Sequence, residues 1–242
     1  MLFCNYIMKK SRHRILFLAL FLPVLPLAAL KLIGAGSLKR IFLSFLYGLK
    51  KSEIEELSRD FVRKDVMHRM YPEMLEEVKK QKKAGARLIL NTASPSFYVK
   101  YIAEELGFDA CYATPIRVHD VMPLLPKLDG RNNKGLVKIV SMLKELPDAF
   151  QKEFNEAAVD LKKPRAYFPV TKIPHSAAFS DSPADLPMLR IAESGTLVNP
   201  SSEDFIQEGQ NSGWTVRRPP RPYSSSFGEA KMYLQQIAGL YE

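Results

Sequence analysis

A strand, a helix and a second strand follow one another near the middle of the chain, and this order most limits the possible folds. Residues 87–91 form a short apolar run typical of a buried strand. Residues 96–106 have helical spacing and end at Gly107, and residues 110–113 form another short strand. A β-α-β order of this kind is typical of parallel strands, so we expect an α/β fold.

The composition limits the size of the fold and the kind of partner. A chain of 242 residues can hold one large domain, or a core domain with a smaller cap. Its net charge of +9 indicates an anionic partner, either nucleic acid or an anionic membrane surface. We do not expect nucleic acid, because the basic residues are dispersed and no stacking motif accompanies them. Cys4 and Cys111 form neither a disulfide framework nor a metal cluster, which fits a reducing compartment.

An uncharged segment at residues 15–30 follows a basic N-terminus. It could be a cleaved signal peptide, a spanning helix, or a helical hairpin lying in the membrane interface. Pro23 and Pro26 would break a spanning helix midway. A second apolar set at residues 41–49 follows a Gly-containing turn. These features favour a hairpin, with a membrane-interface segment at about residues 15–49.

Two carboxylates follow the strand expected at residues 176–180. Asp181 and Asp185 are four residues apart and enter a helix. Ligands of open α/β sheets bind at the carboxyl ends of the strands, so both side chains can face one crevice. Paired carboxylates there suit Mg²⁺. The alternative is a solvated turn in which Asp181 or Ser182 caps the next helix.

Two further residues could bind phosphate. Thr92 comes immediately after the strand at residues 87–91, where its hydroxyl and the amides of Ala93 and Ser94 can donate hydrogen bonds to a phosphate oxygen. Lys138 enters a helix after a Gly-rich turn and can neutralise a phosphate or keep a nucleophilic carboxylate ionised. The alternatives are a helix cap for Thr92 and an exposed helix lysine for Lys138.

Along the chain, Thr92 comes first, then Lys138 after its Gly-rich turn, and then Asp181 and Asp185. In this order, the motifs within residues 72–200 resemble those of the haloacid dehalogenase-like (HAD) phosphatases, in the subgroup typified by phosphoserine phosphatase. The resemblance implies a three-layer Rossmann-like core with a parallel sheet and Mg²⁺-dependent hydrolysis of a phosphate monoester. It makes Thr92 the phosphate-binding hydroxyl and Lys138 the motif lysine. It also implies that Asp181 holds Mg²⁺, while Asp185 orients the metal or a metal-bound water.

The N-terminal segments are similar to the membrane-associated cap of the family's phosphatidylglycerophosphate phosphatases. This resemblance implies an apolar helical cap at residues 1–70 and a core at residues 71–242, with an insertion at about residues 147–174. It further implies a phospholipid phosphate as substrate, at the cytoplasmic face of the inner membrane. A cytoplasmic or periplasmic protein is the alternative location.

One element of the family's chemistry is absent from the sequence. These enzymes use an aspartate nucleophile in a D-x-D motif after the first strand, and no D-x-D occurs here. We expect that the chain is truncated before this motif and its central strand. The alternative is a pseudoenzyme that binds anionic ligands or membranes without turnover.

Overall fold

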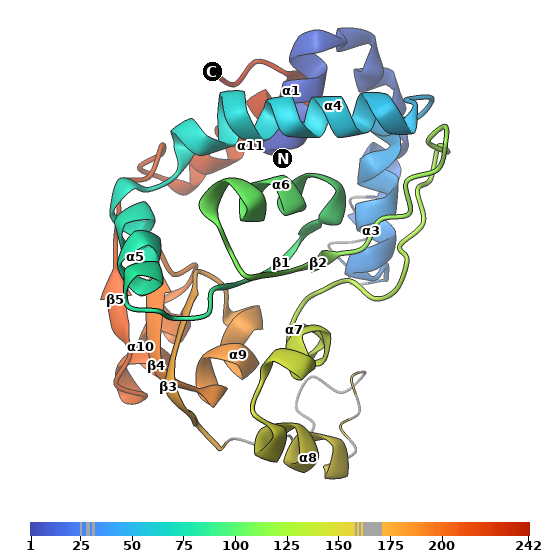
Figure 1. The fold of residues 1–242 in the computed structure, drawn as a ribbon. Coiled ribbons are helices and arrows are strands. Elements are labelled where there is room, and N and C mark those ends of the chain that lie inside the picture. The colour runs from blue at the N-terminus through green and yellow to red at the C-terminus, as the bar shows by residue number, and fades with distance from the viewer. Residues whose placement is uncertain (25, 28–29, 31, 158, 160, 162–170) are drawn as a thin grey trace. The chain divides into compact units, whose positions relative to one another are not determined.

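The computed structural model describes residues 1–24, 26–27, 30, 32–157, 159, 161 and 171–242 (Figure 1). These residues form two compact units, each described here by itself. Unit 1 contains residues 1–90, 94–132 and 221–242, and unit 2 contains residues 91–93 and 133–220. The predicted division into a cap at 1–70 and a core at 71–242 stays a prediction.

Unit 1 is mainly helical. Its α-helices are α1 (Leu2–Lys10), α3 (Ala35–Phe42), α4 (Lys51–Phe61), α5 (Pro72–Lys83), α6 (Ser96–Leu106) and α11 (Ser226–Ala238). Short 3-10 helices are η1 (Arg12–Leu20), η2 (Leu22–Val24), η3 (Leu43–Leu46) and η5 (Met67–Arg69), and η4 (Val62–Val66) is a π-helix. The strands β1 (Ile89–Pro95) and β2 (Ala110–Thr114) pair in a two-stranded sheet, although residues 91–93 of β1 group with unit 2.

Local signals explain the ends of several helices. Pro72 occupies the first turn of α5, where its fixed φ suits the helix and its missing N–H costs nothing. Gly107 ends α6 with φ of 67°, a left-handed conformation that glycine adopts without strain. The helix predicted at 96–106 is confirmed. α4 begins at Lys51 with Lys50 as its N-cap, and the Lys50 amide donates to Glu53 Oε2 at 2.7 Å.

The core of unit 1 is rich in aromatic rings. Phe3 of α1 lies 5.1 Å from Phe61 and 5.3 Å from Phe97, between ring centroids. Most of the second apolar set is buried in the same core, at Leu43, Phe45, Leu46 and Leu49. The burial of these side chains supplies the main stabilisation of the unit. The buried side of α1 also contacts the C-terminal end of the chain, where Asn5 Nδ2 donates a hydrogen bond to the Tyr241 carbonyl at 2.9 Å.

The first apolar segment differs from the second in its exposure. Leu16 and Leu30 of this segment have 72% and 69% of their surface exposed, and Leu32 just after it has 70%, whereas Leu18 is buried in the core. Residues 25, 28, 29 and 31 of the predicted membrane-interface segment lie outside the described residues. Across the residues that the structure describes, no helix combines the length and the apolar character needed to cross a membrane.

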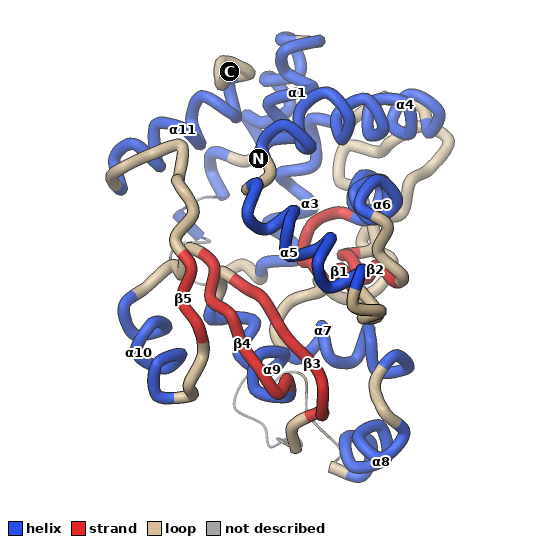
Figure 2. Tube along the Cα trace, turned by 60° about the vertical axis from the view of Figure 1, so that its left-hand side comes forward, coloured by secondary structure: helices blue, strands red, loops and turns tan. Residues whose placement is uncertain are grey.

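Unit 2 contains the larger sheet, in which the parallel strands lie in the order β3-β4-β5 (Figure 2). Its strands are β3 (Ile173–Ser180), β4 (Ala192–Val198) and β5 (Thr215–Arg217). Its helices are α7 (Leu136–Met142), η6 (Leu143–Glu145), α8 (Asp148–Glu156), η7 (Pro183–Asp185), α9 (Leu186–Ile191) and α10 (Glu203–Asn211). α9 connects β3 to β4 and α10 connects β4 to β5, as parallel pairing requires. The predicted α/β fold with parallel strands is confirmed.

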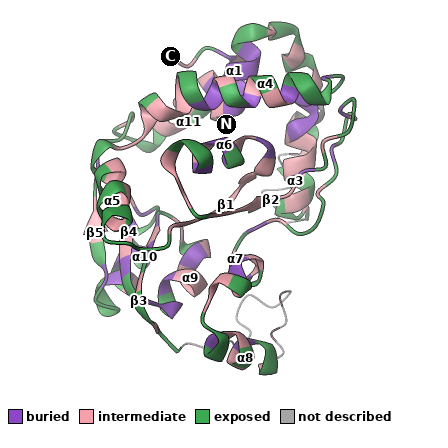
Figure 3. Cartoon of the chain, in the orientation of Figure 1, coloured by how far each residue is buried: buried purple, intermediate pink, exposed green. Residues whose placement is uncertain are grey.

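The core of unit 2 forms where α9 and α10 pack against this sheet. Leu189, Leu197, Phe205 and Trp214 are buried together there, and Figure 3 shows buried stretches on α9. Gly195 of β4 faces the Trp214 ring so closely that a Cβ atom would lie 2.7 Å from it. Residues 158, 160 and 162–170 of the predicted insertion lie outside the described residues.

Candidate functional site

Thr92 lies within a strand, and the prediction that it directly follows a strand is wrong. β1 runs from Ile89 to Pro95, so Thr92, Ala93 and Ser94 continue the strand up to the first residue of α6. The pairing of β1 with β2 provides backbone hydrogen bonds that the polar sequence does not signal. The three predicted phosphate donors therefore occupy the carboxyl-terminal half of β1.

Asn133 holds this strand next to the segment that carries Lys138. Its Nδ2 donates to Asn91 Oδ1 at 2.8 Å and to the Thr92 carbonyl at 3.0 Å. Its Oδ1 accepts from Ser141 Oγ of α7 at 3.0 Å. Asn91 Nδ2 in turn donates to the Lys138 carbonyl at 2.9 Å. Asn133 is 2% exposed, so these bonds satisfy a buried amide and fix β1 against α7.

Lys138 and Asp185 form a buried ion pair. Lys138 Nζ lies 2.7 Å from Asp185 Oδ2, and the two residues are 6% and 7% exposed. Ser180 Oγ donates to the same carboxylate oxygen at 2.7 Å. The Lys138 charge is thus paired with the Asp185 carboxylate, and its predicted roles toward a phosphate or a nucleophilic carboxylate stay predictions. The exposed helix lysine given as an alternative is excluded.

The turn before α7 needs glycine. Gly135 has φ of 62° and ψ of −135° at the N-cap of α7, a conformation that side chains disfavour. This turn starts the helix three residues before Lys138. The sequence therefore places the lysine on the first turn of α7, where its Nζ reaches Asp185 in the turn after β3.

Asp181 has a different environment from Asp185. It follows β3 directly and is exposed, and its carbonyl accepts from the Ser201 amide at 3.2 Å. The cap of the following turn is Ser182, whose Oγ accepts from the Ala184 amide at 3.3 Å. Asp181 is therefore the exposed carboxylate and Asp185 the buried one.

The carboxylates fit Mg²⁺ in kind and number. Mg²⁺ is commonly held by one or two carboxylates, with water and substrate phosphate completing its coordination. Asp181 is exposed, and the described partners of Asp185 both bind Oδ2. No group of three His, Cys, Asp or Glu side chains that could hold a metal occurs among the described residues. Asp181 and Asp185 thus suit Mg²⁺ by the kind of ligand they offer, and the roles of the site residues stay predictions.

Three contributors to the site were missed by the sequence reasoning. They are Asn91, Asn133 and Ser180, all of which bind site residues through their side chains. Asn133 lies five residues before Lys138 in the Gly-rich turn, which was a usable signal. The ion pair had no local signal, because Lys138 and Asp185 are 47 residues apart.

Comparison with curated proteins gives one partial match. Protein CicA of Caulobacter vibrioides, in two strains, is 29% identical over 98 residues. The matched segment covers 40% of this chain and 44% of that protein. The chain therefore spans less than half the length of the curated relatives it matches.

Solved structures share the fold. A protein of unknown function from Bordetella pertussis Tohama I has a TM-score of 0.61 and 19% identity, over 81% of this chain and 79% of that one. A probable phosphoserine phosphatase from Vibrio cholerae has a TM-score of 0.59 and 12% identity, over 98% of this chain and 60% of that one. A phosphoserine phosphohydrolase-like protein from Francisella tularensis has a TM-score of 0.52 and 14% identity, over 90% and 87%.

A family model matches much more of the chain than the curated protein CicA does. A model of the haloacid dehalogenase-like hydrolases matches residues 1–190. This range includes β1, α7, β3 and the complete Lys138–Asp185 pair. The chain belongs to the haloacid dehalogenase-like hydrolase family.

Proposed function

We propose that this site binds the phosphate group of a phosphate monoester and supports its Mg²⁺-dependent hydrolysis. One observation carries the proposal. Three segments expected to form one site are joined within unit 2, because Asn133 bonds to Thr92, Asn91 bonds to Lys138, and Lys138 pairs with Asp185. The fold shared with a probable phosphoserine phosphatase from Vibrio cholerae supports the same reaction class.

Each residue has a proposed task. The Thr92 hydroxyl and the amides of Ala93 and Ser94 bind phosphate oxygens. Lys138 offsets negative charge at the phosphate while its pairing with Asp185 fixes the position of Nζ. Asp181 and Asp185 would hold Mg²⁺, which would lower the effective charge of the group being transferred. Because no D-x-D aspartate occurs in the sequence, hydrolysis by these residues requires water to attack the phosphorus directly, with the alcohol as the leaving group.

The rival function is anion binding without turnover. It is favoured by the absence of a D-x-D motif from the 242 residues, since the family's covalent route needs an aspartate nucleophile. In this alternative, Thr92 and Lys138 still bind an anion, but no phosphate is released.

We also propose a phospholipid phosphate as the substrate and an anionic membrane, at the cytoplasmic face of the inner membrane, as the partner. The support is the net charge of +9 together with the exposed leucines at positions 16, 30 and 32. Basic residues attract anionic headgroups, and exposed aliphatic side chains insert into the acyl boundary.

Phosphate release from p-nitrophenyl phosphate and from a short-chain phosphatidylglycerophosphate tests the reaction. With Mg²⁺ present, we expect release that Asp181→Asn abolishes, whereas Asp204→Asn, at an exposed position of α10, leaves it unchanged. Absence of release from both substrates, with binding to vesicles of anionic lipid retained, would support the non-catalytic alternative. Preference for the lipid over p-nitrophenyl phosphate tests the substrate class separately.

A further inference from the structure

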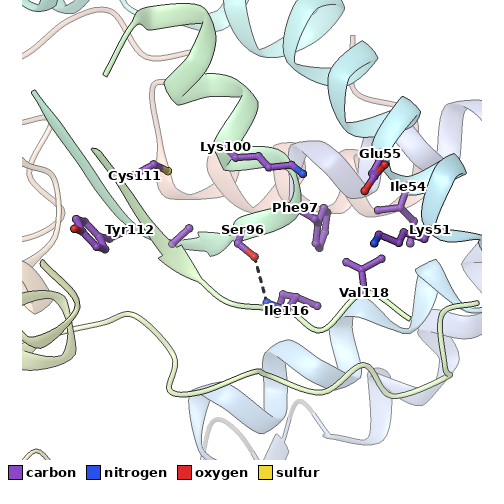
Figure 4. Close-up of a pocket in the computed structure, with 11 residues that line it drawn as sticks. Lys51, Ile54, Glu55, Ser96, Phe97, Lys100, Cys111, Tyr112, Ile116 and Val118 are labelled. Carbon is purple, nitrogen blue, oxygen red and sulfur yellow. Dashed lines mark hydrogen bonds between the residues drawn. The ribbon is translucent and has the colours of Figure 1, made fainter. Parts of the chain in front are cut away.

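A second candidate site lies in unit 1. An open cavity of about 540 Å³ is formed by α4, α6, β2 and the segment after β2 (Figure 4). Its size lies within the range of roughly 300–1,000 Å³ that is usual for small-molecule sites. None of its lining residues belongs to the phosphate site proposed for unit 2.

Apolar side chains form part of the cavity wall. Ile54 of α4, Phe97 of α6, and Ile116 and Val118 after β2 line it. The first three are among the buried core residues, so this part of the wall is fixed by packing. Such a surface favours an apolar group of a ligand, which would leave water on binding.

Two lysines line the same cavity. Lys51 and Lys100 are both exposed and extend toward it from α4 and α6, with the Phe97 ring between them in Figure 4. Glu55 is the single acidic residue among the described residues that line the cavity. Lys100 Nζ lies 4.7 Å from the centre of the Tyr101 ring, a contact that leaves its charge unneutralised. The ionised lining side chains therefore sum to one positive charge.

Hydrogen bonds from backbone amides connect the elements that form the cavity wall. The Lys51 amide donates to the Asp120 carbonyl at 3.0 Å, which fixes the first residue of α4. Ser96 Oγ accepts from the Ile116 amide at 3.3 Å, which ties the start of α6 to the segment after β2 (Figure 4). The walls are thus connected without a ligand, and binding would require little ordering of the backbone.

We infer that this cavity binds an amphipathic anion, a molecule with a carboxylate or phosphate group on an apolar chain. The apolar part lies against Ile54, Phe97 and Ile116, and the anionic group lies between Lys51 and Lys100. The Glu55 carboxylate repels the anionic group and weakens its binding. This assignment is independent of the phosphate site, because no residue is shared.

The test is binding of decanoate, which carries no phosphate for the unit 2 site, to the full chain at low salt, measured by calorimetry. Each of Lys51→Met and Lys100→Met should weaken binding about fivefold, as expected for a partly solvated ion pair. Glu55→Gln should strengthen it, whereas Lys231→Met, an exposed lysine of α11, should leave it unchanged. Acetate, which lacks the apolar chain, and neutral decanol, which lacks the charge, should each bind at least tenfold more weakly than decanoate.

The reactivity of Cys111 gives a second measurement of binding that does not rely on calorimetry. It lines the cavity, whereas Cys4 is buried in the core. Decanoate should slow the alkylation of Cys111 by N-ethylmaleimide, followed by peptide mass spectrometry, and should do so less in Lys51→Met. Equal affinity of wild type and both lysine variants for decanoate would overturn the inference. Equal binding of decanol, or unprotected Cys111 at saturating decanoate, would also overturn it.

Discussion

Replacing Lys138 by methionine tests the buried ion pair most severely. Lys138 Nζ and Asp185 Oδ2 are 2.7 Å apart, and their side chains are only 7% and 10% exposed. Lys138→Met keeps an unbranched apolar stem but leaves the Asp185 charge buried. Removing one partner of a buried pair costs roughly 3–5 kcal/mol. The hydrogen bond from Ser180 Oγ to Asp185 remains, so we expect the lower end of this range, about 3 kcal/mol.

The assay is urea unfolding followed by the fluorescence of Trp214. This residue is the single tryptophan and belongs to unit 2, as the ion pair does. The loss corresponds to a fall in the melting temperature of roughly 6–12 °C for a chain of this size. Lys134→Met is the matched control, since Lys134 is exposed four residues earlier and should change stability by less than about 0.5 kcal/mol.

The double variant Lys138→Met/Asp185→Leu separates the charge from the packing. It removes the uncompensated carboxylate, so we expect it to recover a large part of the stability lost in Lys138→Met. If Lys138→Met unfolds at the same urea concentration as Lys134→Met, the pair does not stabilise unit 2 and the argument is wrong.

Three further predictions concern other buried groups. Asn133→Ala removes the bonds that join β1 to α7 and should lower the free energy of unfolding by about 2–3 kcal/mol, measured in urea. Gly195→Ala brings a Cβ within 2.7 Å of the Trp214 ring, so it should cost about 1–3 kcal/mol and shift the tryptophan emission; unchanged emission would contradict the contact. Burial raises the pKa of the Cys4 thiol from 9.0 to about 12. The unfolded state therefore loses this proton first, and stability should fall above about pH 9 by up to about 1.4 kcal/mol per pH unit, a slope that Cys4→Ala should reduce.

Elements with local signals were predictable from the sequence. The start of α5 at Pro72 and the end of α6 at Gly107 depend on the conformations of single residues. The sequence also indicated the β-α-β order and the parallel strands. β1 was placed too early, because Thr92 and Ser94 are polar and the strand extends through pairing with β2 rather than through hydrophobic alternation.

The candidate site was predictable in its residues but not in its contacts. Motif order singled out Thr92, Lys138, Asp181 and Asp185, yet nothing local to the sequence joins Lys138 to Asp185 across 47 positions. The apolar N-terminal segments show the same limit. Their composition suits a membrane interface or a core equally, and burial of Phe45 and its neighbours is decided by tertiary packing.

Phosphate release in the presence and absence of Mg²⁺ tests the central claim most directly. The purified protein is incubated with p-nitrophenyl phosphate, and wild type is compared with Asp181→Asn and Lys138→Met at a temperature at which both variants are folded. We predict Mg²⁺-dependent release by wild type and its loss in both variants. Release that is absent from wild type, or that persists unchanged in Asp181→Asn, would contradict the assignment of a phosphate monoester hydrolase.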